Sequence, residues 1–217
     1  MSDLLGVSQL VGRVDHLVFA TPDVERTSAD LERRFGVRPS PGGQHTGRGT
    51  RNILIAIGPA CYMEIVGPDP GQEPPSTPRW FGIDTLSEPR LVTWAASATD
   101  LNRVVKDAAR RGVRLGDVGV GRRKRLYGVD LTWQFTDPTV VLCDGLVPFL
   151  IDWGASPHPW MTAVVGPRLV DLHGEHPHPE RVMDMLDALG IAMRVTQAAH
   201  PSLVATLQTD AGLYELR

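Results

Sequence analysis

The sequence predicts an α+β fold in which repeated β-α-β-β-β modules form a curved-sheet cup with helices outside. Two stretches, 12–66 and 89–154, show the same order of a strand, a helix and further strands. Their helices end in matching segments, Phe35-Gly36-Val37-Arg38 and Arg111-Gly112-Val113-Arg114. Only one helix accompanies each four strands, which argues against a doubly wound parallel sheet. Repeats of this kind indicate duplicated supersecondary units rather than a solenoid.

The first copy begins with a strand over residues 11–22, which ends at a proline. A helix is predicted over residues 23–35, where Asp23 can cap the first turn. After a turn-rich stretch, two strands are predicted near residues 51–57 and at 61–66. Side chains alternate between the two faces of a strand, so one face is expected to be buried and the other to line a cavity.

The second copy repeats this order, and a shorter third copy follows it. In the second copy, a strand, a helix and two later strands are predicted over residues 91–96, 100–111, 131–135 and 148–153. In the third copy, a strand, a helix and two strands are predicted over residues 169–172, 179–189, 203–207 and 213–216.

These copies divide the chain into a first module at residues 1–67, a second at 89–160 and a shorter third at 161–217. The stretch 68–88 is rich in proline and polar residues and is predicted to link the first two modules. The third copy is only half a cup, and an open sheet edge is a liability that proteins usually cover. We therefore expect it to pack on another module or on the same segment of a second chain, which favours a homodimer.

The composition is that of an ordinary globular protein. Of the 217 residues, 42% are hydrophobic and 22% are charged, and the net charge of −3 gives no reason to expect a nucleic acid partner. The run Arg122-Arg123-Lys124-Arg125 is interpreted as a solvated loop, with contact to an anionic ligand or nucleic acid as the alternative. No apolar run approaches the roughly 20 residues of a membrane helix. No signal peptide is recognised and the two cysteines show no metal spacing, so a cytoplasmic protein is expected.

Several common catalytic and cofactor motifs are absent from the sequence. Neither serine nor cysteine occurs in a recognisable nucleophile motif, and there is no phosphate loop of the Walker type. The pairs Gly42-Gly43 and Gly47-Arg48-Gly49 do not follow a predicted strand and open a helix, as a dinucleotide fingerprint would. We therefore expect no nucleotide cofactor.

Five short motifs follow one another along residues 12–160. They are Val14-Asp15-His16-Leu17-Val18-Phe19, the glycine-rich segment from Gly42 to Asn52, Tyr62-Met63-Glu64-Ile65-Val66, Pro148-Phe149-Leu150-Ile151-Asp152-Trp153-Gly154 and Ser156-Pro157-His158-Pro159. In this order and spacing they resemble the glyoxalase-like branch of the vicinal oxygen chelate superfamily. Each motif is weak alone, and the resemblance rests on their combination.

The resemblance implies a divalent metal site. In the superfamily the first strand of a module supplies a histidine and the last strand a glutamate, and these positions match His16 and Glu64. Such ligands suit zinc, nickel, manganese or iron, and open coordination positions let the metal polarise substrate oxygens. The alternative is that the two residues form only a hydrogen-bonded pair in the core.

The other copies depart from the family pattern. Aligning the second copy places Thr93 opposite His16 and Ile151 opposite Glu64, and neither is a strong metal ligand. In the third copy the corresponding residues are Asp171 and Glu215. The sequence therefore does not support a complete four-ligand centre.

Further site residues are expected in the glycine-rich segment and after the second copy. His45 is a candidate general base or third metal ligand, because an imidazole titrates near neutral pH. Arg48 and Asn52 supply hydrogen-bond donors for an oxygen-rich ligand, unless this segment is only a flexible surface turn. At the rim of the cup, Trp153 is expected to form an apolar wall, or to pack in the core, and His158 to make a polar contact.

Three functions fit this sequence. A metal-assisted lyase, isomerase or dioxygenase would act on a small oxygenated molecule. A metal-free protein would bind or sequester a small ligand in the same cup. A structural or dimerisation protein would keep only a degenerate cup, and the fold alone does not decide among the three.

Overall fold

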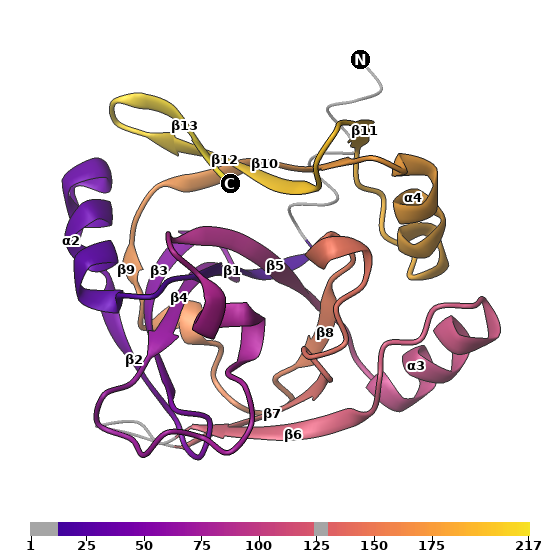
Figure 1. Ribbon diagram of the computed structural model, residues 1–217, viewed down its shortest axis with the longest axis horizontal. Helices are drawn as coiled ribbons and strands as arrows, with labels where there is room; N and C mark the ends of the chain where they lie inside the picture. Colours follow the sequence, from indigo (N-terminus) through magenta and orange to yellow (C-terminus); the bar gives the residue numbers. More distant parts are fainter. Residues whose placement is uncertain (1–12, 124–129) are drawn as a thin grey trace.

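The computed structural model describes residues 13–123 and 130–217, and three units of one strand, one helix and three strands follow one another (Figure 1). The first unit consists of β1 (Val14–Ala20), α2 (Val24–Phe35), β2 (Ser40–His45), β3 (Thr50–Gly58) and β4 (Cys61–Pro68). The second consists of β5 (Arg90–Ser97), α3 (Leu101–Arg110), β6 (Val118–Arg123), β7 (Leu131–Thr136) and β8 (Phe149–Asp152). The third consists of β10 (Arg168–His176), α4 (Pro179–Ala188), β11 (Val195–Gln197), β12 (Ser202–Thr209) and β13 (Gly212–Leu216).

Four shorter elements lie between or within the units. They are the 3-10 helices η1 (Trp80–Thr85), η2 (Cys143–Gly145) and η3 (Pro159–Met161), and the strand β9 (Val164–Val165), which pairs with β3. Helix α2 begins as the sequence predicts, since the side chain of Asp23 accepts a hydrogen bond from the backbone N–H of Arg26. It ends at Gly36, which has a φ of 71° and closes the helix in the left-handed region.

The first two units share one curved sheet. Its strand order is β2-β3-β4-β1-β5-β8-β7-β6, and the antiparallel pairing of β1 with β5 joins the two units. The strands at its ends, β2 and β6, contact each other, so the sheet wraps into a nearly closed cup. Helices α2 and α3 lie on the outside of the cup (Figure 1). The predicted α+β cup of repeated modules is confirmed.

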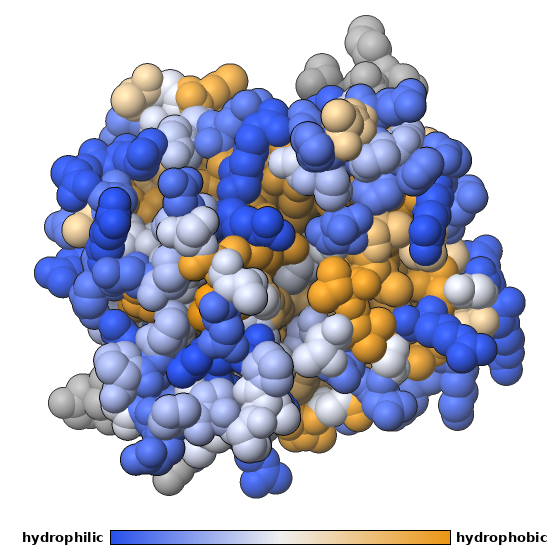
Figure 2. Space-filling model, viewed as in Figure 1, coloured by the Kyte–Doolittle hydropathy of each residue, from blue (hydrophilic) through white to orange (hydrophobic). Residues whose placement is uncertain are grey.

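The third unit forms a separate sheet in the order β11-β10-β12-β13. This sheet lies across the outer face of the cup, where β10 contacts β3 and β12 contacts β5 (Figure 1). In the same view, apolar side chains show in the seam between the third sheet and the cup, under a mostly hydrophilic surface (Figure 2). The third unit therefore packs on the other modules of its own chain, and a homodimer remains a prediction.

Residues of β1 and β4 alternate between two buried environments. Leu17, Met63 and Ile65 belong to the main core, which the third sheet completes with residues such as Leu203 and Leu207. The intervening residues point into the cup, where Val18, Ala20, Val66 and Ile83 form a second apolar cluster. The parallel register of these strands pairs His16 with Tyr62 and Val18 with Glu64. Strand parity therefore directs His16 and Glu64 to the inside of the cup.

Membrane insertion finds no support in the helices that the structure describes. Over residues 13–123 and 130–217, none combines the length and the apolar character that crossing a bilayer requires.

Candidate functional site

The inside of the cup contains a narrow cavity of about 50 Å³. The first unit contributes most of the polar residues of its wall: His16, His45, Asn52, Tyr62 and Glu64. The other wall residues are Trp80, Phe81, Arg123, Trp133, Phe135, Pro138, Phe149, Ile151 and Trp153. Half of the wall residues are Phe, Tyr or Trp, so the polar groups lie in surroundings that exclude water and strengthen their electrostatic interactions.

Glu64 lies between two histidines. Its Oε2 atom is 3.7 Å from Nε2 of His16, and its Oε1 atom is 3.5 Å from Nε2 of His45. All three side chains are buried, and Glu64 is 7% exposed. The predicted metal ligand His16 and the predicted base His45 therefore both lie beside the carboxylate of Glu64, the other predicted metal ligand.

His16 is held from behind by the neighbouring Asp15. Its Nδ1 atom lies 2.8 Å from Oδ1 of Asp15. Asp15 also accepts hydrogen bonds from Ser97 Oγ at 3.0 Å and from Trp153 Nε1 at 3.1 Å. His158 Nε2 lies 3.1 Å from the same carboxylate. The backbone N–H of Trp160 donates to Nδ1, the other ring nitrogen of His158. The Nε2 atom of His158 therefore carries the hydrogen and donates a hydrogen bond to Asp15.

Asp15 is ionised at neutral pH. Burial raises its pKa, but the hydrogen bonds from His158 and His16 and the electrostatic attraction of these two rings outweigh burial, so the pKa of Asp15 lies below its usual value. An ionised carboxylate only accepts hydrogen bonds. His16 must therefore carry a proton on Nδ1, and its Nε2 atom is presented to Glu64.

Asn52 sets the orientation of His45 and of Glu64. Its amide nitrogen donates to Oε1 of Glu64 and lies 3.3 Å from Nε2 of His45, which consequently accepts. The pKa of His45 is lowered mainly by burial and also by the charges of Arg123 and Arg48, although Glu64 opposes the shift. His45 is therefore a neutral imidazole at neutral pH.

The glycine-rich segment lets Asn52 approach the backbone of β2. A Cβ atom at residue 42 would lie 2.0 Å from Oδ1 of Asn52, so only glycine fits there. The same Oδ1 atom accepts a hydrogen bond from the backbone N–H of Gly43 at 2.9 Å. Gly42 and Gly43 therefore lie on strand β2, whereas residues 46–49, which include Arg48, form a turn.

The second unit supplies a positive charge to the cavity wall. Arg123 ends β6, as His45 ends β2, and its Nη1 atom lies 3.4 Å from Oδ1 of Asn52. Ile151 lines the cavity at the place opposite Glu64 that the repeat predicts. At these two places the second unit therefore contributes a guanidinium and an apolar side chain, and neither is a metal ligand.

The model of a family described as "Glyoxalase-like domain" matches residues 14–190. The chain belongs to the glyoxalase-like domain family. It is thereby a member of the vicinal oxygen chelate superfamily, and the resemblance seen in the sequence is confirmed.

The chain is similar to several solved structures, of which the first shows the same fold. A hypothetical protein from Staphylococcus aureus is similar with a TM-score of 0.65 and 11% identity, over 94% of this chain and 98% of that one. The methylmalonyl-CoA epimerase from Mycobacterium tuberculosis has a TM-score of 0.44 and 17% identity, over 67% of this chain and 90% of that one. A hypothetical protein from Bacillus halodurans has a TM-score of 0.44 and 12% identity, over 67% and 96%. No curated protein matches the chain.

The glyoxalase-like chain brings most residues named from its sequence to this site. Arg48 lies outside the cavity, with its guanidinium carbon 4.5 Å from the ring centroid of Trp80. Trp153 lines the cavity and also donates to Asp15. His158 contacts Asp15 and stacks edge-on to Tyr62, and it is not among the cavity-lining residues that the structure describes.

Two wall residues were missed because they lie in the predicted linker. Trp80 and Phe81 belong to η1, and Phe81 has a φ of 62°, which is rare for a residue other than glycine. Within a proline-rich stretch they show no strand or helix periodicity, so the only signal was the pair of adjacent aromatic residues.

The residues of the glyoxalase-like cup fit only part of a metal site. His16 and Glu64 are suitable ligands, and an imidazole whose Nδ1 is bonded to a carboxylate is a common arrangement at metal centres. Across the described residues, however, no group of three or more His, Cys, Asp or Glu side chains is placed to hold a metal ion. Asp171, the third unit's counterpart of His16, instead pairs with His173 and Arg194.

Proposed function

We propose that the cup is the active site of an enzyme that transfers a proton to and from a small oxygenated molecule, with Glu64 and His16 as the groups that carry the proton. The observation that supports this most is the 3.7 Å separation of Glu64 Oε2 and His16 Nε2. The Nδ1–H of His16 donates a hydrogen bond to Asp15. The Nε2 atom of His16 and the Oε2 atom of Glu64 are therefore two acceptors that face each other unless a proton is shared between them. Such a pair is suited to taking up and releasing one proton.

The surrounding residues support chemistry at a carbon next to a carbonyl group. Removing a proton there places negative charge on the carbonyl oxygen. The buried guanidinium of Arg123 can stabilise this charge, and a water-poor cavity makes the stabilisation stronger. His45 is neutral and lies 3.5 Å from Oε1 of Glu64, so it is the second candidate base.

The proposal predicts exchange of substrate protons with solvent. Small 2-oxo and 2-hydroxy acids and acyl thioesters would be incubated with the protein in D2O, and deuterium incorporation followed by proton NMR. We expect at least one class to exchange, and E64Q to slow the exchange by about 100-fold or more, because an amide cannot accept the proton. E25Q is the matched control, since Glu25 is exposed and pairs with Arg51 outside the cavity. Binding without exchange in the unaltered protein would contradict the enzyme and favour a sequestration protein.

A second candidate function is a metal-assisted version of the same enzyme. The orientation of His16 by Asp15 favours it, because the free Nε2 atom and Glu64 could together hold a zinc, nickel, manganese or iron ion. Such an ion would polarise a substrate oxygen. Elemental analysis of the purified protein, before and after incubation with each metal, tests this version. The metal-assisted version predicts about one ion per chain, which H16A loses and H158A keeps. A metal content that H16A leaves unchanged would contradict this version.

A further inference from the structure

A groove beside the cavity carries an excess of positive charge. It has a volume of about 520 Å³ and shares Trp80 and Arg123 with the cavity wall. Among the described residues that line it, Arg48, Arg122 and Arg123 are opposed by one carboxylate, Asp130. The protein as a whole has a net charge of −3, so this local excess is not a general property of its surface.

Arg123 lies where the groove and the cavity meet. Only 6% of its surface is exposed, and its Nη1 atom is 3.4 Å from the Asn52 oxygen. The amide nitrogen of Asn52 donates in turn to Glu64. One side chain therefore separates the guanidinium from the carboxylate of the proposed proton transfer, so a ligand bound by Arg123 would also be within reach of Glu64.

Arg48 holds a second guanidinium at the outer side of the same wall. Its guanidinium carbon lies 4.5 Å from the ring centroid of Trp80, a distance typical of a cation–π contact. Arg48 is exposed, so an anion can bind it without a large desolvation cost.

The walls shared by the groove and the cavity are flat and apolar. Trp80, Trp133 and Phe135 line both, and the ring centroids of Trp80 and Phe135 are 6.1 Å apart. Aromatic walls with a few convergent polar groups are typical of sites for planar organic molecules.

We propose that the ligand of this site is an organic acid with an aromatic or otherwise planar body, whose anionic group is bound by Arg123 and Arg48. The proposal deepens the function proposed above and rests on the cup being a small-molecule site. Carboxylates and phosphates both present oxygens that a guanidinium binds through paired hydrogen bonds. The planar body lies along the shared aromatic wall, and the reacting end of the ligand points to Glu64.

Three probes of matched shape test the proposal: phenylacetate, phenyl phosphate and the neutral phenylacetamide. Binding would be followed by tryptophan fluorescence, because Trp80 and Trp133 line the groove. We expect at least one of the two acids to bind about tenfold more tightly than the amide, since a charge-assisted hydrogen bond is worth about 1.5–3 kcal/mol. The acid that binds identifies the anionic group as carboxylate or phosphate.

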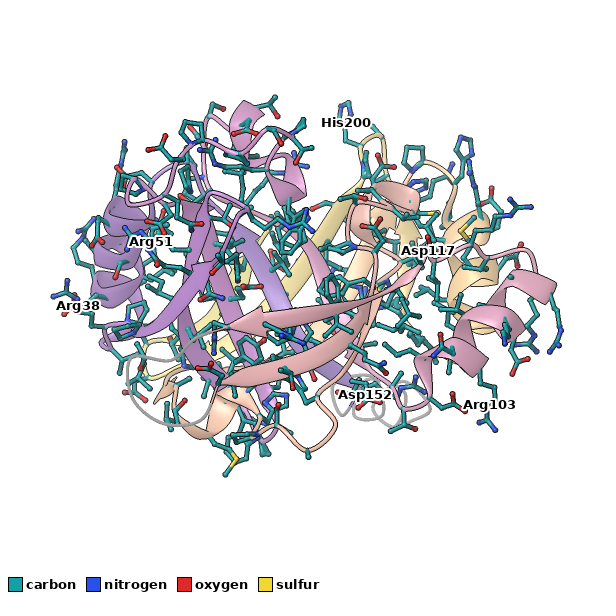
Figure 3. All side chains as sticks on the ribbon, turned by 90° about the horizontal axis from the view of Figure 1, so that it is seen from below. Arg38, Arg51, Arg103, Asp117, Asp152 and His200 are labelled. Atoms are coloured by element: carbon teal, nitrogen blue, oxygen red, sulfur yellow. The ribbon has the colours of Figure 1, made fainter. Side chains whose placement is uncertain are left out.

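Arginine substitutions locate the binding site. R123Q is expected to weaken binding of the acid by about tenfold or more and to leave binding of phenylacetamide unchanged. R48Q is expected to act in the same direction, and because Arg48 is exposed this variant should fold even if R123Q does not. R38Q is the matched control, since Arg38 lies outside the cup near α2, away from the groove (Figure 3).

Three results would overturn the proposal. They are equal binding of the amide and the acids, failure of both acids to bind at millimolar concentration, and unchanged binding of the acid to R48Q and to folded R123Q. The test is independent of proton transfer, because it measures binding and not exchange. Acid binding that depends on these arginines, without any deuterium exchange, would contradict the proposed enzyme and support the ligand class.

Discussion

Replacing Asp15 by leucine is expected to lower the free energy of unfolding by about 3–5 kcal/mol, since it removes the acceptor at the centre of a buried network. Asp15 is 1% exposed and accepts from His16, Ser97, Trp153 and His158. Leucine has the same branched shape and the same number of side-chain heavy atoms and leaves no cavity, so the cost arises mainly from donors that lose their partner. Urea denaturation followed by circular dichroism measures the effect.

The matched control for D15L is the same substitution at Asp152. Asp152 is half-buried, and its side chain bonds the backbone N–H of Gly154. We expect D152L to cost about 1 kcal/mol or less. Equal effects of the two substitutions would contradict a special role for the Asp15 network.

The contribution of Asp15 should depend on pH. Its pKa in the folded protein lies below the ordinary value of 3.8, so its stabilising effect is complete above that value and is lost as the pH falls below it. The difference in unfolding free energy between the unaltered protein and D15N should therefore be constant near neutral pH and shrink toward about pH 3. A difference that grows on acidification would show that Asp15 is not held in its ionised form.

Replacing Leu207 by alanine is expected to destabilise the cup as well as the third unit, by about 2–5 kcal/mol. Leu207 lies on β12, is fully buried and belongs to the core that both sheets share. All five tryptophans of the chain precede residue 161, so none lies on the third unit and tryptophan fluorescence follows the cup. If the third unit and the cup unfold together, L207A must shift the fluorescence transition by the full amount.

Leu213 provides the control on the neighbouring strand. It is 69% exposed, and L213A should change the unfolding free energy by less than about 0.5 kcal/mol. A fluorescence transition that L207A leaves in place, while circular dichroism detects a separate earlier transition, would show that the third unit is an independent domain.

The sequence predicted the parts of the structure that depend on local pattern. Strand parity predicted that His16 and Glu64 project into the same cavity. In the structure both side chains point into the cup, and Nε2 of His16 lies 3.7 Å from Oε2 of Glu64. The capping residue Asp23 and the helix exit at Gly36 were readable because each has a specific hydrogen bond or backbone conformation. The repeat of one strand, one helix and three strands identified the fold, because each copy kept these local signals.

Contacts between distant segments were not readable from the sequence. The acceptor for Trp153 and His158 is Asp15, which precedes them by 138 and 143 residues. Arg123 was assigned to a solvated loop because it belongs to a basic run, yet the cup buries it beside Asn52. The third sheet covers the outer face of the cup, and no periodicity in residues 168–217 specifies the face against which it packs.

A long-range proton–nitrogen NMR spectrum of the histidine side chains tests most directly whether Glu64, His16 and His45 form one proton-transfer centre. It would be recorded for the unaltered protein and for E64Q. We expect the Nε2 signals of both His16 and His45 to shift in E64Q, since each lies within 3.7 Å of this carboxylate. The Nδ1 atom of His16 should stay protonated through its bond to Asp15, and His173 should be unaffected. Unchanged Nε2 signals of His16 and His45 in a folded E64Q protein would contradict the account.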